Sequence, residues 1–284
     1  MLGYEINYVD EVIIKNKTSI REICVPFNFS KSAYVGLMYA AEFAKMIGAD
    51  ITILHCFQST ALEFGSASDV EYSTTAYERK IEILKKVPAL SLVNTSFLIE
   101  HSFMPEMLKE LDQDGKIDMV ILGSQISTER EKFLGTNASS LVNSIDVPLL
   151  IIPDDAKHTS IKNIMFAADF KEFESLESID ILKKFANISG AKLHIVHVID
   201  HPVNPNQSVV LKKLKEIFAD IDHQFYDFNH PNVHNGLKEI ARLNKMDLLV
   251  MTPRKHGFIE TIYKKSETKK MAMDTKLPLL IFQE

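Results

Sequence analysis

A glycine-containing loop in the first half of the chain carries the residue types best suited to binding a phosphate. It starts at Gly123 and Ser124 and ends at Gly135, Thr136 and Asn137, directly before a helical pattern. Free backbone N–H groups, a hydroxyl and the positive end of a helix dipole suit a phosphate. The same residues also fit an ordinary N-cap, with Thr136 capping the helix and Gly135 allowing the bend. Because short glycine motifs often occur by chance, these residues leave both interpretations open.

Other patterns of catalytic or metal-binding residues are weak or missing in the sequence. It contains no Gly-x-Ser-x-Gly elbow, no Walker lysine loop and no paired catalytic carboxylates. His194 and His197 are three residues apart on an expected strand, so they should point to opposite faces. His230 and His234 have no obvious third ligand, and His55, like His197, is interpreted as structural. We therefore expect no metal site and no enzyme activity, with slow ATP hydrolysis as the one catalytic option left open.

The elements that would position these residues alternate between short apolar runs and longer helical patterns. Nearly continuous apolar runs predict buried strands, and i, i+3, i+4 spacing predicts helices between them. Ser30 or Ser32 can cap the first helix, and Gly48 can end it in the left-handed conformation. In the first half the expected strands are 22–25, 51–57, 95–100, 119–123 and 149–152, and the expected helices are 32–47, 70–87, 105–114 and 137–144.

The second half of the chain repeats the first at an offset of 142 residues around Ala44/Ala186, Gly48/Gly190, Ala49/Ala191 and His55/His197. Self-similarity over such a distance indicates a duplicated domain with loops of unequal length. In the second half the expected strands are 163–167, 192–199, 223–228, 248–251 and 279–282, and the expected helices are 175–189, 209–220, 234–244 and 266–275.

Strand–helix alternation in both halves predicts an α/β protein with two similar domains, each an open parallel sheet with helices on both faces. The domains are expected at 1–153 and 160–284, joined by a polar linker at 151–162. Residues 1–20 have no counterpart in the second half. The small and polar region 58–75 is expected to be a surface loop beside the strand ends.

Charge and composition exclude several classes of function. The net charge is −6, with −7 on residues 1–153 and +1 on residues 154–284, which disfavours general nucleic-acid binding. One basic stretch, 254–270, is interpreted as a solvated helix face. No apolar run reaches the ~20 residues of a membrane span, and the first residues lack a secretory signal. With Cys24 and Cys56 read as buried thiols, these features predict a cytoplasmic protein without disulfides or membrane contact.

Several motifs together resemble the universal stress protein family. They are V-P-F-N-F-S at 25–30, I-L-H-C at 53–56, D-M-V-I-L-G-S at 118–124 with L-G-T-N at 134–137, and V-P-L-L-I-I at 147–152. The resemblance covers nearly all of both halves and implies five-stranded parallel sheets in the order 3-2-1-4-5. It implies that ATP or AMP binds, or that this ability has been lost. In that family the last strands of two protomers pair, so 149–152 and 279–282 are expected to pair within this chain as a pseudo-dimer. Further homodimerisation stays open.

The resemblance assigns a nucleotide site to the first half. Asn28 stands where the family's Asp holds the ribose, and Cys56, with Pro26, stands where backbone meets adenine. Ile126 replaces the family's second loop glycine, and the loop is one residue shorter than the family pattern. An Ile side chain cannot take a positive φ or let the backbone approach a phosphate without strain. The residues that would face phosphates are Gly123, Ser124, Gly135, Thr136 and Asn137.

The second half keeps a different part of the same site. The carboxylate at the ribose position is retained, whereas lysines replace loop glycines. A lysine ammonium can meet a phosphate as a point charge, but the backbone cradle is missing. By the resemblance, Asp169, Val198 and Ser266 correspond to Asn28, Cys56 and Thr136, and Thr252, Lys255 and Lys265 occupy the three glycine positions.

The leading functional hypothesis is a cytoplasmic stress-response binding protein whose first domain holds ATP or AMP. The alternative is a nucleotide-free interaction module that acts through an unknown protein partner. In that case the region 58–75 or the basic stretch 254–270 would meet the partner.

Overall fold

The computed structural model describes residues 20–57, 67–124, 145–156, 161–168, 176–199, 207–251 and 277–282 of the 284-residue chain. In the first half the strands are β1 (Glu22–Pro26), β2 (Asp50–Cys56), β3 (Thr95–Glu100), β4 (Met119–Ser124) and β5 (Leu149–Pro153). The helices there are α1 (Lys31–Ile47), α2 (Ala67–Leu84), the 3₁₀-helix η1 (Pro88–Leu92) and α3 (Met104–Gln113).

The second half repeats this sequence of elements. Its strands are β6 (Asn163–Ala167), β7 (Lys192–Ile199), β8 (His223–Asn229), β9 (Leu248–Met251) and β10 (Leu279–Ile281). Its helices are α5 (Leu176–Ser189), α6 (Gln207–Ile217) and α7 (Val233–Leu243). The predicted strands and helices that fall on described residues are therefore confirmed, with small differences at their ends.

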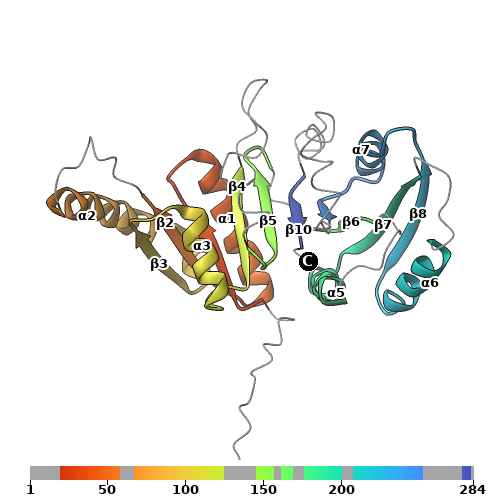
Figure 1. Ribbon diagram of the computed structural model, residues 1–284, viewed down its shortest axis with the longest axis horizontal. Coiled ribbons are helices and arrows are strands. Elements are labelled where there is room, and N and C mark those ends of the chain that lie inside the picture. The colour runs from red at the N-terminus through yellow and green to blue at the C-terminus, as the bar shows by residue number, and fades with distance from the viewer. Residues whose placement is uncertain are drawn as a thin grey trace, which may run out of the picture.

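All the strands form one sheet, in the order β3-β2-β1-β4-β5-β10-β9-β6-β7-β8 (Figure 1). Within each half the strands are parallel and follow the predicted order 3-2-1-4-5. The two five-stranded parallel half-sheets that the sequence predicts are joined into this one sheet, because β5 and β10 pair antiparallel, with Leu150 opposite Leu280. That pairing confirms the predicted contact of the last strands, and it satisfies two backbone edges that would otherwise be free.

Buried apolar clusters cover the sheet on both faces. Along β1, Ile23 and Val25 belong to one cluster and Cys24 to the other, as the alternation of side chains in a strand requires. Helices α1, α5 and α6 contribute to the first cluster, and α3 and α7 to the second. The first cluster extends across the junction, where the rings of Phe43 and Phe185 lie 5.2 Å apart between centroids. The two halves thus share a core as well as a sheet.

Local signals set the ends of α1 as the sequence predicts. Ser30 is the N-cap, and its side chain accepts a hydrogen bond from the Ala33 N–H. Gly48 ends the helix at φ 72°, and its N–H donates to the Ala44 carbonyl. Such a positive φ is readily available to glycine because it has no Cβ.

Two local expectations need correction. The region 58–75 is not a loop throughout, because α2 already begins at Ala67. Small polar residues predict such a helix poorly, but its later turns pack Leu84 into the core, and tertiary packing overrides weak propensity. The 3₁₀-helix η1 was also not predicted. The expected helices 137–144 and 266–275 lie outside the described residues, as does the segment 1–19. None of the described helices is long and apolar enough to cross a membrane.

Candidate functional site

The carboxyl ends of β1, β2 and β4 meet at one edge of the first half-sheet. Strand β1 lies between its two neighbours, with Pro26 opposite Leu54 of β2 and Cys24 opposite Val120 of β4. Ligands of open parallel sheets bind at such an edge, where the strand order reverses. The structure therefore brings together the predicted site residues Pro26, Asn28, Cys56, Gly123 and Ser124. Ile126, Gly135, Thr136 and Asn137 lie outside the described residues.

The turn from β1 into α1 is fixed by side-chain hydrogen bonds. Exposed Asn28 accepts a hydrogen bond from the Ser30 N–H through Oδ1, at 3.1 Å. Between them, Phe29 has φ 62°, a conformation that bulky residues rarely adopt. Asn28 is thus held at the strand edge by an Asx-type turn that includes one strained residue.

Gly123 has a packing role that the sequence did not reveal. A Cβ on Gly123 would collide with the Ser32 carbonyl oxygen at the start of α1. A Cβ on Gly36, one turn further along α1, would lie 2.6 Å from the Gly123 backbone nitrogen. The two glycines let helix and strand backbones touch, so Gly123 is required here whether or not a phosphate binds. A glycine inside a helical pattern was the available signal for Gly36.

The two cysteines differ in exposure. Cys24 is fully buried as predicted, but Cys56 is only partly buried, which corrects the expectation for that residue. Burial, with a smaller contribution from Glu100, raises the pKa of Cys56 to about 11. Its thiol is therefore neutral at ordinary pH and unsuited to nucleophilic chemistry. Both thiols are free, in agreement with the prediction of no disulfide.

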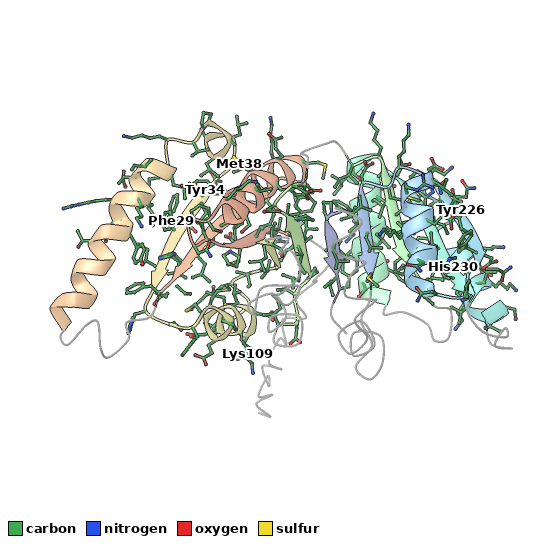
Figure 2. All side chains as sticks on the ribbon, turned by 90° about the horizontal axis from the view of Figure 1, so that it is seen from above. Phe29, Tyr34, Met38, Lys109, Tyr226 and His230 are labelled. Atoms are coloured by element: carbon green, nitrogen blue, oxygen red, sulfur yellow. The ribbon has the colours of Figure 1, made fainter. Side chains whose placement is uncertain are left out.

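An aromatic cluster beside these strand ends was missed by the sequence analysis. It consists of Phe27, Phe29, His55, Phe57 and Tyr77. The His55 ring lies 4.1 Å from the Tyr77 ring and 5.1 Å from the Phe29 ring, measured between centroids. Phe29 lies in the region between α1 and α2 (Figure 2). The cluster docks α2 on the half-sheet, and only the fold brings these residues together.

The second half has different side chains at the equivalent edge. His197, at the position of His55, places Nδ1 3.3 Å from Asp227 Oδ1. Val198 is buried, and a Cβ on Gly236 of α7 would lie 3.0 Å from its side chain. Asp169, Thr252, Lys255, Lys265 and Ser266 lie outside the described residues. The basic stretch 254–270 lies there as well.

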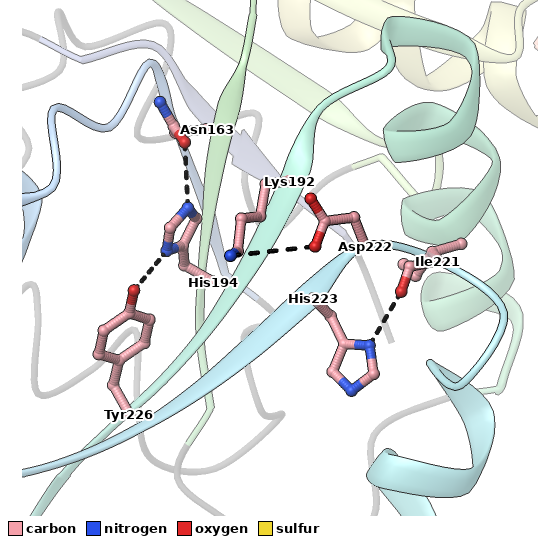
Figure 3. Close-up of polar contacts among 7 residues, drawn as sticks. All are labelled: Asn163, Lys192, His194, Ile221, Asp222, His223 and Tyr226. Atoms are coloured by element: carbon pink, nitrogen blue, oxygen red, sulfur yellow. Dashed lines mark hydrogen bonds and ion pairs between the residues drawn. The ribbon is translucent and has the colours of Figure 1, made fainter.

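A polar cluster occupies the opposite, amino edge of the second half-sheet (Figure 3). His194 contacts the Tyr226 hydroxyl through Nδ1 at 3.0 Å and Asn163 Oδ1 through Nε2 at 3.1 Å. Burial, and then Lys192, lowers the pKa of His194. As predicted, His194 and His197 point to opposite faces, since Val196 and Ile195 belong to opposite core clusters. No group of three potential metal ligands gathers within the described parts of the chain.

The fold and this edge define a class of protein, the α/β proteins in which parallel strands reverse their order at a carboxyl edge. Within that class, residues 19–153 match the Universal stress protein family. No curated protein matches the chain.

Solved structures match nearly the whole chain at low sequence identity. One is a universal stress protein from Archaeoglobus fulgidus DSM 4304, with a TM-score of 0.70 and 17% identity, covering 92% of this chain and 98% of that one. Another is a functionally unknown protein from Pseudomonas aeruginosa PAO1, with a TM-score of 0.57 and 14% identity, covering 94% of each chain. At these identities the matches show a shared fold.

Proposed function

We propose that this protein is a tandem universal stress protein of the cytoplasm whose first domain binds ATP or AMP. The tandem assignment is supported by the sequence repeat and by the identical strand order of the two halves. The binding assignment is supported by the family match of residues 19–153 and by the place where the predicted contact residues meet.

The observation that carries the proposal is the meeting of Asn28, Cys56 and Ser124 at the edge where β1 separates β2 and β4. All three are at least partly exposed, as ligand contacts must be. The amino end of α1 lies directly against Gly123, so the positive end of a helix dipole faces the same edge. An anionic ligand with hydroxyl groups fits this combination of groups.

Asn28 offers a direct test of the ribose contact. Aspartate can keep the turn, because its carboxylate also accepts the Ser30 N–H, while it forms stronger hydrogen bonds to hydroxyls. We expect Asn28→Asp to tighten ATP or AMP binding about tenfold, or about 1.4 kcal/mol. Asn235→Asp is the matched control, because Asn235 is exposed in the first turn of α7.

Calorimetric unfolding with ATP, with AMP and without nucleotide measures this binding. A nucleotide at 100 times its dissociation constant should add about 2.7 kcal/mol to the free energy of unfolding. If neither nucleotide stabilises the wild type or Asn28→Asp, the proposed function is wrong.

We further propose that the site binds rather than hydrolyses. Its only described thiol, Cys56, is neutral, and this supports the absence of covalent chemistry. Phosphate release from ATP, followed over hours and compared between wild type and Gly135→Lys, tests this. If the wild type releases phosphate and Gly135→Lys does not, the protein is a slow ATPase.

One observation favours the alternative, a nucleotide-free interaction module. Tyr34 is 40% exposed and Phe103 57% exposed, each at the start of a helix that follows a strand of the first half. Exposed aromatic residues are typical of protein-binding surfaces. Failure of the nucleotide test would leave this function as the better hypothesis.

A further inference from the structure

His55 is a buried histidine, and one of its two ring nitrogens is hydrogen-bonded. Its Nδ1 lies 2.6 Å from the Phe27 carbonyl oxygen. A carbonyl can only accept, so Nδ1 carries the proton, and Nε2 is the unprotonated nitrogen of the neutral ring. The residue is 6% exposed, and Nε2 has no hydrogen-bond partner among the described residues.

The rings around His55 come from three elements. Tyr77 of α2, Phe29 of the β1–α1 turn and Phe57 after β2 lie 4.1, 5.1 and 6.4 Å from its ring centroid. Rings of this kind can attract a cation over their faces. However, the Lys80 ammonium of α2 already lies 5.0 Å from the Phe29 centroid and 5.2 Å from the Tyr77 centroid.

None of the charged and titratable groups described near His55 would offset the positive charge that a second proton brings. Lys80 of α2 faces it with a positive charge. Next to it on β2, Cys56 is a neutral thiol, and beyond β3 the His101 ring contacts Phe57 at 5.3 Å between centroids. No carboxylate among the described residues pairs with His55. A proton on Nε2 would therefore create a buried, unpaired charge beside a lysine, which is costly.

Two more histidines are buried in the described part of the chain, His194 and His197, and both have polar partners for their ring nitrogens. His194 places Nδ1 on the Tyr226 hydroxyl, whose oxygen can accept from a protonated ring (Figure 3). His197 places Nδ1 beside the Asp227 carboxylate, which would pair with an imidazolium. Each of these two rings thus has an oxygen acceptor beside it, whereas the described residues offer no acceptor to Nε2 of His55.

We propose that His55 makes the docking of α2 sensitive to acid. The docking contact is the packing of Tyr77 and Lys80 on His55 and Phe29. Protonation of Nε2 breaks it, because moving Tyr77 and Lys80 away exposes the imidazolium to water and separates the two positive charges. Phe29, at φ 62°, then loses its contacts with Tyr77 and Lys80, and the turn that carries Asn28 is less firmly held.

The direction of the pH effect follows from linkage. Burial, and then Lys80, lowers the pKa of His55 below its usual value of 6.5. A lowered pKa in the docked state means that docking is fully stabilised above about pH 6.5 and weakens as the pH falls through the lower value. Between about pH 6.5 and that lowered value, undocking should become up to about tenfold more favourable per pH unit, and below it the effect levels off because both states are protonated.

Amide hydrogen exchange of residues 75–84, measured without nucleotide and corrected for the intrinsic pH dependence of exchange, tests the proposal. In the wild type, protection of α2 should fall between about pH 7.5 and about pH 5. In His55→Gln, which cannot take up the proton, protection should not depend on pH. The matched control His197→Gln should behave like the wild type. Protection of wild-type α2 that is independent of pH, or an equal loss in His55→Gln, would overturn the proposal.

Lys80→Gln keeps the proposal testable if His55→Gln fails to fold. Lys80 is exposed, so the fold should tolerate the change. Without the ammonium, the docked state tolerates a protonated His55 better, so α2 should lose less protection between about pH 7.5 and about pH 5 than it does in the wild type. An equal or larger loss would contradict the role given to Lys80. Because no nucleotide is present, these results do not depend on the proposed function.

Discussion

The two half-sheets share their strand order but differ at their carboxyl edges. In the first half, the histidine of the second strand is enclosed by Phe29 and Tyr77, and α2 covers it. In the second half, the equivalent His197 pairs with Asp227, a residue that is largely exposed. The two halves agree in the sheet, because each inner strand must match two neighbours. The strand ends are less constrained by the sheet, and there one half has an apolar environment and the other a polar one.

The junction of helix and strand differs as well. Gly36 and Gly123 allow α1 to touch β4 in the first half, and buried Ser178 of α5 stands at the position of Gly36 in the second. A hydroxyl there leaves less room for close approach of the backbones. In the first half, the start of α1 lies directly against the candidate phosphate edge.

The largest expected effect comes from filling that close contact. Gly123→Ala places a methyl group against the Ser32 carbonyl, where backbone must move, and we expect a loss of about 3 kcal/mol in the free energy of unfolding. Gly236→Ala is the control in the second half, because its Cβ would meet only side chains, at 3.0 Å. Its effect should stay below about 1 kcal/mol. Urea unfolding measures both, and equal losses would contradict the distinction between the halves.

The second expected effect concerns the stability of the protein at low pH. If the two histidines differ as their partners suggest, wild type and His55→Gln should diverge in stability as the pH falls below about 6.5, with the wild type losing more. His197→Gln, which replaces the equivalent histidine of the second half, is the matched control and should follow the wild type. Thermal unfolding over a pH series measures this, and parallel pH curves for all three proteins would contradict the comparison.

A third prediction concerns the pH dependence of nucleotide binding. It depends both on the proposed function and on the proposed role of His55. Release of the turn that carries Asn28 should weaken ATP or AMP binding at low pH in the wild type but not in His55→Gln. Isothermal titration at about pH 7.5 and about pH 5.5 would show it. Equal weakening in both proteins would assign the pH effect to the nucleotide phosphates instead.

The smallest effect tests what the two halves still share. Lys85 lies over Phe97 of β3 at 5.5 Å, and Lys215 lies over Phe225 of β8 at 5.7 Å. Lys85→Gln and Lys215→Gln should each cost about 0.5 kcal/mol, since both contacts are at the surface. Lys85 also pairs with Glu82 at 2.6 Å, but an exposed pair adds little. A cost several times larger in one half would show that the duplicated contact is not equivalent.

Much of the fold could be predicted because its signals are local. The apolar runs of β1, β2 and β4 and the caps at Ser30 and Gly48 each lie within a few residues of the element they define. The repeat predicted the same order of strands and helices in both halves, and the family resemblance implied the strand order within each sheet. The start of α2 at Ala67 was missed, because its helix is stabilised by contacts with distant residues more than by its own composition.

The candidate site was predicted less completely. The sequence placed Asn28, Cys56 and Ser124 at strand ends, and parallel pairing brings them to one edge. It could not show that Gly123 meets Ser32, or that Tyr77 reaches His55 from a helix twenty-two residues later in the chain. Those contacts depend on how helices pack across strands, which no local pattern specifies.

By itself, the sequence predicted an α/β chain with two similar halves, the order of its elements and the ends of α1, because periodicity and caps act over short distances. Only the tertiary structure decided the antiparallel register that joins β5 to β10, that two glycines bring α1 onto β4, and that His55 is enclosed without an acid partner among the described residues. These depend on contacts between segments far apart in the chain, and their energies arise only once the backbone has brought those segments together.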